Sequence, residues 1–383
     1  MLNILHIIPS LSKGGAERLV LDICNNLNSK ERLRIKLITF SDNNNFPFLT
    51  KNIDWKVIPS FVKLSILKKN KTFIKKLQIA IEQFKPDIIH THLFEAEIIS
   101  RSCFYPKAKW FSHCHDNMKQ FQNFSWRTLT KKELFTNFYE KLLLIKHYKK
   151  CNNNFIAISK DTEKYFYNAL PSNLSQNIYF LPNAISFNHF YHPEKSKHNI
   201  EKNNLIKFVT IGSLVNKKNQ IFLIDVVRIL LQKNYKIKLD ILGDGINKKD
   251  IQKKIDEYNF QDNVFLRGNV ANVEDYLHTA CIYVHSATYE PFGLVLLEAM
   301  AAGLPVVCLD GKGNRDIIEQ GKNGFMIDKQ SAELFAEKII ELIENKKLYQ
   351  SMSAFAIEFA RKYDIKEYVD KLINIYKMAL NEK

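Results

Sequence analysis

Residues 286–307 read SATYEPFGLVLLEAMAAGLPVV, and this stretch decides the fold of the second half of the chain. Pro291 and Gly293 predict a loop that ends at a helix start, LVLLEAMAA predicts the helix, and Gly303 predicts its end. The apolar residues that follow predict a buried strand. Because the first turn of a helix leaves backbone N–H groups unpaired, this corner suits an anion. An ordinary capped helix of an α/β domain is the alternative interpretation.

Two carboxylates, Glu290 and Glu298, lie in this stretch. They could form an acid/base pair. The intervening loop and helix, however, do not direct both carboxylates at one target. We therefore expect them to serve two parts of one ligand.

Outward from this stretch, strand-like and helix-like segments alternate in both halves of the chain, from NILHIIP near the N-terminus to CIYVHS before residue 286. Such alternation predicts parallel sheets, whose ligands bind at the carboxyl ends of the strands. Glycine-rich and polar candidates fall at those ends, namely Gly14–Gly15, His90/His92, His113/His115, 213–218, 243–245 and Glu290. We predict an α/β fold of two Rossmann-like parallel-sheet domains facing each other across a deep cleft.

The expected domain boundaries follow from composition. Residues 191–205 are polar without apolar periodicity and predict a linker between domains at 1–190 and 206–362. Residues 363–383 predict a C-terminal helix that packs back on the first domain. A lysine-rich helix is expected over 65–84.

Composition excludes several classes of protein. The 383 residues are 46% hydrophobic and 25% charged, which is typical of a globular chain. No apolar run approaches the ~20 residues of a membrane span, and no signal peptide precedes the first strand. The six cysteines are scattered without a C-x-x-C pair, which favours reduced thiols in a cytoplasmic protein.

The net charge of +16 is concentrated in the first half, where residues 1–199 carry 30 Lys+Arg against 15 Asp+Glu. A basic half suggests an anionic partner such as nucleic acid, a membrane surface or a phosphorylated acceptor. Compositional bias toward lysine is the alternative. Residues 121–150 predict an amphipathic helical region that either packs on the domain or contacts lipid headgroups.

The histidines of His90-Thr-His92 and His113-Cys-His115 have i,i+2 spacing, which places both rings of a pair on one face of a strand. No carboxylate or cysteine pattern completes a zinc site around them. Neutral histidines at strand ends suit hydrogen bonding to sugar hydroxyls or phosphate oxygens. A core histidine is the alternative for His90.

Two further loops have weaker signals. Gly14-Gly15 lets the backbone approach a ligand closely, although the G-x-G-x-x-G fingerprint is not met. Lys217-Lys218, in the first strand-to-helix loop of the second half, can meet a diphosphate as a point charge.

Together these motifs resemble glycosyltransferase family 4, a family of retaining enzymes with the two-Rossmann architecture called GT-B. The Glu290-x7-Glu298 pattern is the most specific of them, and the closest likeness is to members that build bacterial capsules, exopolysaccharides or lipopolysaccharide. The matching motifs, in family order, are GGAER (14–18), PDIIHTH, SHCHDN, ISKDTEKYF, LPNAISFNHF, IGSLVNKKNQ, ILGDG and the segment ending in residues 286–307.

The resemblance implies roles for individual residues. Glu290 would hydrogen-bond the donor sugar, Glu298 the nucleotide ribose, and Lys218 would neutralise the departing diphosphate. His115 would reach the reacting sugar, so His115 and Glu290 are the expected catalytic residues. The remaining donor-binding candidates are Gly15, Ser213, Phe292, Gly293, Leu294 and Val295, and the acceptor-side candidates are Gly14, His92 and His113.

One position departs from the family pattern. Many members carry arginine where this chain has Ser213, so a second cation for the diphosphate is missing there. Either Lys217 or Arg267 supplies it, or Lys218 and the backbone hold the diphosphate alone.

The activity implied is metal-independent, retaining transfer of a hexose-type sugar from a nucleotide-diphosphate sugar, with UDP first and GDP second, without a cofactor. The 1–190 domain would bind a lipid-linked or glycan acceptor and the 206–362 domain the nucleotide sugar. The basic half would bind an anionic membrane surface on the inner face of the cell membrane. Alternatives are a sucrose- or glycogen-synthase-like transferase with a soluble acceptor, and a basic nucleic-acid-binding module, for which no arginine-rich strip or recognition helix is found.

Overall fold

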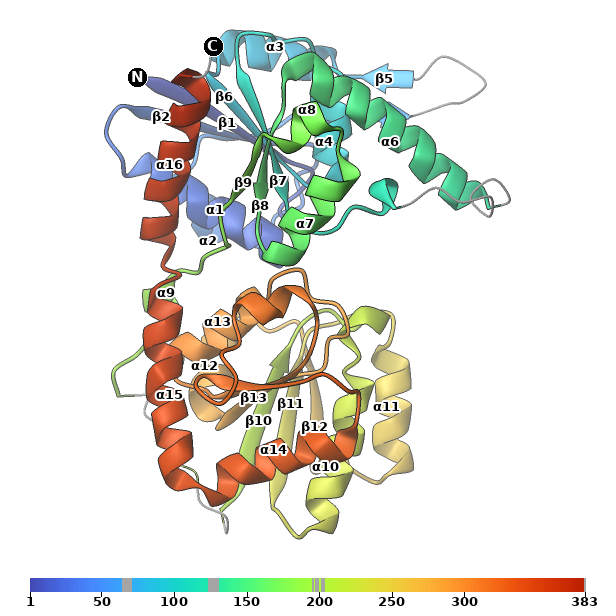
Figure 1. The fold of residues 1–383 in the computed structure, drawn as a ribbon, viewed down its shortest axis with the longest axis vertical. Helices are drawn as coiled ribbons and strands as arrows, with labels where there is room; N and C mark the ends of the chain where they lie inside the picture. Colours follow the sequence, from blue (N-terminus) through green and yellow to red (C-terminus); the bar gives the residue numbers. More distant parts are fainter. Residues whose placement is uncertain (64–70, 123–130, 195, 197–199, 201–203, 382–383) are drawn as a thin grey trace. The chain divides into compact units, whose positions relative to one another are not determined.

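The computed structural model describes residues 1–63, 71–122, 131–194, 196, 200 and 204–381. They form two compact units, Met1–Asn183 with Ile365–Lys383 (unit 1) and Ala184–Asp364 (unit 2) (Figure 1). The predicted class of two Rossmann-like parallel-sheet domains is confirmed. The predicted linker at 191–205 falls within unit 2, and its residues 195, 197–199 and 201–203 lie outside the described residues.

The sheet of unit 1 has seven parallel strands in the order β3-β2-β1-β6-β7-β8-β9. The order reverses between β1 and β6, which is where ligands bind in open parallel sheets. The strands are β1 (Leu2–Ile8), β2 (Leu33–Thr39), β3 (Trp55–Val57), β6 (Ile88–His92), β7 (Lys109–Cys114), β8 (Asn154–Ala157) and β9 (Ile178–Phe180).

Helices cover this sheet with their apolar sides. One core joins residues of the strands to α3 (Lys75–Phe84), α4 (Phe94–Ser100), α6 (Lys132–Cys151) and α7 (Lys160–Ala169). Elsewhere in the unit, α16 (Ile365–Asn381) contacts α1 (Gly15–Asn28) and places Tyr376 against His90. Short helices at α2 (Pro47–Thr50), η1 (Lys119–Phe121) and α8 (Ser172–Ser175) complete the described part of the unit.

The predicted helix over 65–84 is wrong at its start. Lys71–Phe73 forms strand β5, antiparallel to β4 (Phe61–Lys63), and α3 begins only at Lys75. The physical reason is periodicity, because the buried helical repeat begins at Leu77, whereas Thr72 and Phe73 favour a strand. Residues 64–70 lie outside the described residues, as do 123–130 of the predicted helical region at 121–150.

Unit 2 has a second parallel sheet, of six strands in the order β12-β11-β10-β13-β14-β15. Here the order reverses between β10 and β13. The strands are β10 (Ile206–Ile211), β11 (Ile237–Leu242), β12 (Val264–Gly268), β13 (Ile282–His285), β14 (Val306–Leu309) and β15 (Gly324–Ile327). The helices are α9 (Phe187–Phe190), η2 (Asn216–Lys218), α10 (Ile221–Gln232), α11 (Lys248–Glu257), α12 (Val273–Thr279), α13 (Leu294–Ala301), η3 (Gly313–Asp316), α14 (Ala332–Glu344) and α15 (Lys346–Arg361).

Among the described helices, none is both long enough and apolar enough to cross a membrane.

Candidate functional site

The loop after β13 occupies the point where the strand order of unit 2 reverses. It connects β13 to α13 and lies beside the loop after β10. A hydrogen bond from the Ser286 hydroxyl to the carbonyl of Lys218 (2.9 Å) joins the two loops. The backbone of Thr288 likewise donates to the carbonyl of Lys217 (2.9 Å). Two chain segments about 70 residues apart are therefore held together at the carboxyl ends of neighbouring strands.

Glu290 is the centre of this site. Its side chain is nearly buried, and one carboxylate oxygen pairs with the Lys218 ammonium and lies 3.1 Å from Nε2 of His285. Burial alone would raise the pKa of Glu290, but the Lys218 charge and the His285 ring overcome burial and lower the pKa to about 2. Burial lowers the pKa of His285. The cluster therefore holds an ionised carboxylate at neutral pH.

The backbone of Glu290 is fixed as firmly as its side chain. Its N–H donates to the carbonyl of Gly311 (2.8 Å), and its carbonyl accepts from the N–H of Gly313 (3.0 Å). A side chain at Gly313 would meet the carbonyl oxygen of Pro291 at 2.0 Å, so only glycine allows this approach. The carboxylate is thus positioned by two loops.

Gly293 ends the loop with a φ of 105°, a conformation that favours glycine, and α13 starts at Leu294 as predicted. The first N–H groups of α13, those of Leu294 and Val295, therefore point out of the helix end beside Glu290. The predicted loop, helix start and following strand are therefore present, and anion binding at this corner stays a prediction.

Glu298 lies within α13, four residues after its first residue, Leu294. Burial, and then the carboxylates of Glu298 and Glu290, raises the pKa of the Tyr283 phenol. Tyr283 accepts a hydrogen bond from the N–H of Ile211 (3.2 Å) at the end of β10. Both predicted carboxylates therefore border the same strand ends.

The three candidate cations differ in their partners. Lys218 pairs with Glu290, whereas Nε of Arg267 donates to Asp240 (2.6 Å). The ammonium of Lys217 lies 5.4 Å from the centre of the Tyr289 ring. Ser213 is exposed in the loop between β10 and η2, and its carbonyl accepts from Gln220 (3.1 Å). Of these cations, Lys218 is the one held against Glu290.

In unit 1, Gly14 precedes the N-terminus of α1 in extended conformation, and Gly15 is the first residue of that helix. A side chain at Gly14 would meet the carboxylate of Glu17 at 2.4 Å. Burial raises the pKa of Glu17. This loop follows β1, at the edge where the histidines also end.

A histidine array, comprising His6, His90, His92, His113 and His115, lies at this edge on the neighbouring strands β1, β6 and β7. The predicted i,i+2 pairing is confirmed, because the rings of His90 and His92 lie 4.5 Å apart and those of His113 and His115 lie 4.1 Å apart. All members except His115 are essentially inaccessible to solvent.

Burial and mutual repulsion keep the array neutral. Burial, followed by the neighbouring rings, lowers the pKa of His6 to about 3 and the pKa values of His92 and His115 well below the ordinary value. Burial also lowers the pKa of His113 to about 4, against a hydrogen bond with Asn183 (3.1 Å). Uncharged imidazoles can each donate one hydrogen bond and accept one.

Three members form a hydrogen-bonded chain. Nδ1 of His6 lies 3.0 Å from Nε2 of His92, and Nδ1 of His92 lies 3.0 Å from Nε2 of His115. Nε2 of His6 is buried without a partner. A bare acceptor there costs less than an orphaned N–H, which favours protons on Nδ1 of all three rings. His115, which is partly exposed, would then present an N–H donor at Nδ1.

Two triplets of the array, His6/His90/His92 and His92/His113/His115, have nitrogens within 4.8 Å of one another. The rings of His113 and His115, however, are nearly parallel, with an angle of 8° between them. Imidazole lone pairs lie in the ring plane, so stacked rings do not direct them at one ion. The array fits hydrogen bonding better than metal coordination.

Family models match nearly the whole chain. Residues 13–188 match the model for Glycosyltransferase Family 4, and residues 192–359 match the model for Glycosyl transferases group 1. The chain belongs to glycosyltransferase family 4.

Curated relatives of this glycosyltransferase-family chain include two enzymes named for poly(polyol-phosphate) substrates. It is 31% identical over 177 residues to the poly(glycerol-phosphate) alpha-glucosyltransferase of Bacillus subtilis, a match of 46% of this chain and 26% of the relative. It is 33% identical over 168 residues to the poly(ribitol-phosphate) alpha-N-acetylglucosaminyltransferase of Staphylococcus aureus, covering 43% of this chain and 34% of the relative. The chain therefore spans about a quarter to a third of the length of these relatives.

Among solved structures, Anabaena HepE in complex with UDP and glucose is similar to this family member, with a TM-score of 0.77 and 19% identity. The match covers 98% of this chain and 100% of HepE. This likeness agrees with the predicted GT-B fold.

Sequence reasoning missed three residues that contact Glu290. His285 was not singled out because a lone histidine at a strand end has no spacing signal. Gly311 and Gly313, which press on Glu290, follow a buried strand as Gly-x-Gly, and that pattern could have indicated a close backbone approach.

Proposed function

We propose that this chain is a retaining glycosyltransferase that moves a hexose-type sugar from a UDP-sugar to a lipid-linked or glycan acceptor of a bacterial surface polysaccharide. The observation that carries the proposal is the Glu290–Lys218–His285 cluster beside the start of α13, in a chain of family 4. HepE, which has the same fold, binds UDP and glucose in its crystal structure, and this supports UDP as the nucleotide.

The proposed chemistry separates charge. Breaking the bond between the sugar and the diphosphate leaves negative charge on the diphosphate, which Lys218 and the N–H groups at the start of α13 would stabilise. Glu290 would accept hydrogen bonds from hydroxyls of the donor sugar, and Glu298 from the ribose. Lys218 would turn from Glu290 toward the diphosphate as the donor binds.

Retention is the second part of the proposal. The two curated relatives are named as alpha transferases, and UDP-hexoses carry an alpha bond to the diphosphate, so an alpha product retains configuration. We propose front-face attack, in which the acceptor hydroxyl loses its proton to a leaving phosphate oxygen. His115 would donate from Nδ1 to the reacting sugar.

The proposed reaction needs no metal, because Lys218 and α13 supply the positive charge that a metal would otherwise give the diphosphate. Dialysis against EDTA should leave the rate unchanged, and full recovery only on adding Mg²⁺ or Mn²⁺ would contradict this.

The acceptor is proposed to be anionic or membrane-bound. Residues 1–199 carry the basic excess, and the two relatives act on polyol-phosphate polymers by name. We propose that the chain works on the inner face of the cell membrane, held there peripherally by its basic half.

The deciding experiment incubates the purified chain with labelled UDP- and GDP-sugars and a lipid-linked acceptor, and measures transfer and the anomeric configuration of the product. Transfer from a UDP-sugar with an alpha product is expected. Absence of both transfer and nucleotide binding for every donor would refute the proposal. Transfer to soluble sugars alone would favour the sucrose- or glycogen-synthase-like alternative.

A further inference from the structure

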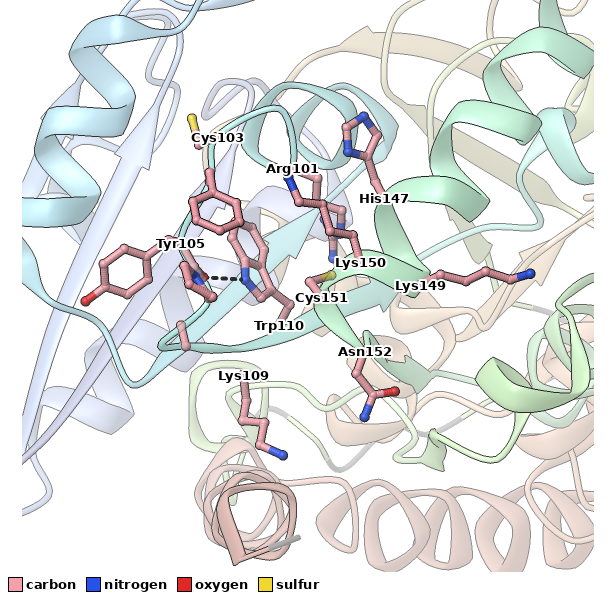
Figure 2. A pocket seen from close by; sticks show the side chains of 13 residues that line it. Arg101, Cys103, Tyr105, Lys109, Trp110, His147, Lys149, Lys150, Cys151 and Asn152 are labelled. Atoms are coloured by element: carbon pink, nitrogen blue, oxygen red, sulfur yellow. Dashed lines mark hydrogen bonds between the residues drawn. The ribbon is translucent and has the colours of Figure 1, made fainter. Parts of the chain in front are cut away.

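Unit 1 contains a cavity of about 300 Å³ away from its histidine edge. It lies at the amino ends of β7 and β8, since Lys109 and Trp110 begin β7 and Asn152 lies two residues before the start of β8. His113 lies near the other end of β7, four residues after Lys109, so about 13 Å of strand separates the cavity from the histidine edge. The thirteen lining residues are Arg101, Cys103, Phe104, Tyr105, Pro106, Ala108, Lys109, Trp110, His147, Lys149, Lys150, Cys151 and Asn152 (Figure 2).

An aromatic wall gives the cavity its shape. Trp110 is buried, and its Nε1 donates to the carbonyl of Tyr105 (3.2 Å), which ties the wall to the loop before β7 (Figure 2). Phe104 is 59% exposed at the cavity, and its backbone is fixed by the side chain of Gln78, which bonds both its N–H and its carbonyl (2.8 Å each). A fixed loop that exposes a large aromatic ring offers a prepared surface for a planar or apolar group.

The charge of the lining is of one sign. Lys109, Lys149 and Lys150 line the cavity with His147, and none of the lining residues is a carboxylate. Lys150 lies 4.4 Å from the centre of the Phe104 ring, so a cation and an aromatic face adjoin.

Arg101 has a structural role, because its guanidinium is engaged in hydrogen bonds inside the unit. Its guanidinium donates to Asn153 (2.6 Å), Ser112 (2.8 Å) and Thr91 (2.8 Å) and lies near the buried carboxylate of Glu97. Of the lining cations, Lys149 and Lys150 are therefore the groups that would offer charge to a ligand.

The pKa of His147 reflects the electrostatic potential at the cavity. Burial, followed by the charges of Arg101, Lys150 and Lys146, lowers the pKa of its imidazole to about 4. An anion bound beside it would stabilise the imidazolium and raise this pKa.

We propose that this cavity is a second ligand site, which binds a phosphate ester that carries an aromatic or apolar group. The lysines bind the phosphate as charge-assisted donors, and the wall of Phe104, Tyr105 and Trp110 receives the rest of the ligand. A volume of about 300 Å³ suits a small ligand of this kind. The ligand is a soluble phosphate ester or the headgroup of an anionic lipid, which share this chemistry.

The test titrates the full chain by calorimetry with three probes, namely phenyl phosphate, glycerol 3-phosphate and dihexanoyl phosphatidic acid below its micelle concentration, with dihexanoyl phosphatidylcholine as the uncharged-headgroup control. Phenyl phosphate or the phosphatidic acid should bind saturably, and glycerol 3-phosphate should bind more weakly because it lacks an apolar group. Binding of phenyl phosphate assigns a soluble ester, and binding of the phosphatidic acid alone assigns a lipid. Absence of binding by both, or equal binding of glycerol 3-phosphate, overturns the proposal.

Location is tested with paired variants. The double substitution Lys149→Gln/Lys150→Gln should weaken the affinity for the probe by about tenfold or more, because charge-assisted contacts are lost. The matched control is Lys75→Gln/Lys76→Gln, which removes another adjacent, exposed lysine pair, on α3. NMR of labelled histidines should show the pKa of His147 rising on binding, with the signal assigned by His147→Gln.

A last variant separates this site from the proposed reaction. Lys218→Gln should leave probe binding unchanged, so the second site stands or falls independently of sugar transfer. Loss of binding in Lys218→Gln, or its persistence in Lys149→Gln/Lys150→Gln, would place the probe elsewhere and refute the proposal.

Discussion

In both sheets the strand order reverses at the middle, but the side chains at the carboxyl ends of the strands there differ in charge. In unit 1, stacked histidines are neutral because burial lowers their pKa values. In unit 2, Glu290 is equally enclosed, yet it stays charged because Lys218 adjoins it. Burial of an ionisable group therefore has two outcomes, which depend on whether an opposite charge accompanies it.

This difference matches the two needs of glycosyl transfer. In the proposed reaction, Lys218 at the edge of unit 2 would supply the positive charge that a departing diphosphate needs. The histidine array would supply the uncharged donors and acceptors that sugar hydroxyls need. Substitutions in either group can test whether the charged and the uncharged roles are divided between the two sheets in this way.

The largest effect is expected from Glu290→Gln. The amide keeps the size of the side chain but removes the charge that accepts hydrogen bonds and pairs with Lys218. We expect the rate of sugar transfer to fall by about 10³-fold, comparable to the loss of one essential electrostatic contact in an active site. Initial rates with a labelled donor measure this.

The matched control for that variant is Glu337→Gln, an exposed carboxylate on α14. It should transfer sugar at the normal rate. A melting temperature close to that of the unchanged chain would show that Glu290→Gln is folded, and near-normal transfer by that folded variant would exclude the assigned role.

Lys218→Ala is expected to have the next largest effect, on binding rather than on folding. Loss of the ammonium should weaken UDP affinity by about 1–3 kcal/mol, the range for a hydrogen bond to a charged group. Calorimetry with UDP measures the change. Lys217→Ala and Arg267→Ala then test for a second cation, because a residue that replaces the arginine missing at Ser213 should also weaken UDP binding. Unchanged UDP binding in both variants would leave Lys218 and the backbone to hold the diphosphate alone. An unchanged dissociation constant for Lys218→Ala would contradict the diphosphate role.

Local sequence patterns predicted the features that depend on neighbours along one chain segment. The start of α13 after Gly293 and the shared face of His90 and His92 are such features. Contacts between distant segments were not predictable, because periodicity within a strand does not identify the strand beside it. The Lys218–Glu290 pair and the contact of His6 with His92 join residues 72 and 86 positions apart.

His92→Gln should have a smaller effect, confined to the rate. It breaks the chain from His6 to His115 and frees the tautomer of His115. We expect kcat to fall by about tenfold, the effect of losing one hydrogen bond of about 1.4 kcal/mol, with UDP affinity unchanged. A purely structural role would lower melting temperature and UDP affinity together, so separation of kcat from UDP affinity is the informative result.

Acid stability bears on the comparison directly and measures folding rather than activity. Because His6 has a pKa of about 3 in the folded chain and an ordinary value of 6.5 when unfolded, the unfolded state binds more protons below pH 6.5. The free energy of unfolding should therefore fall as pH drops from 6.5 toward 4, by up to about 1.4 kcal/mol per pH unit for each neutral histidine. Glu290 adds its own loss only as pH falls from 4.5 toward about 2.

Urea unfolding between pH 7.5 and 5 measures the slope of the unfolding free energy with pH. His6→Leu should make the slope shallower, whereas Ile4→Val, buried on the same strand, should lower stability equally at every pH. A stability independent of pH over this range would mean that the histidines have the same pKa values in the folded and unfolded chains, and the contrast between the two edges would disappear.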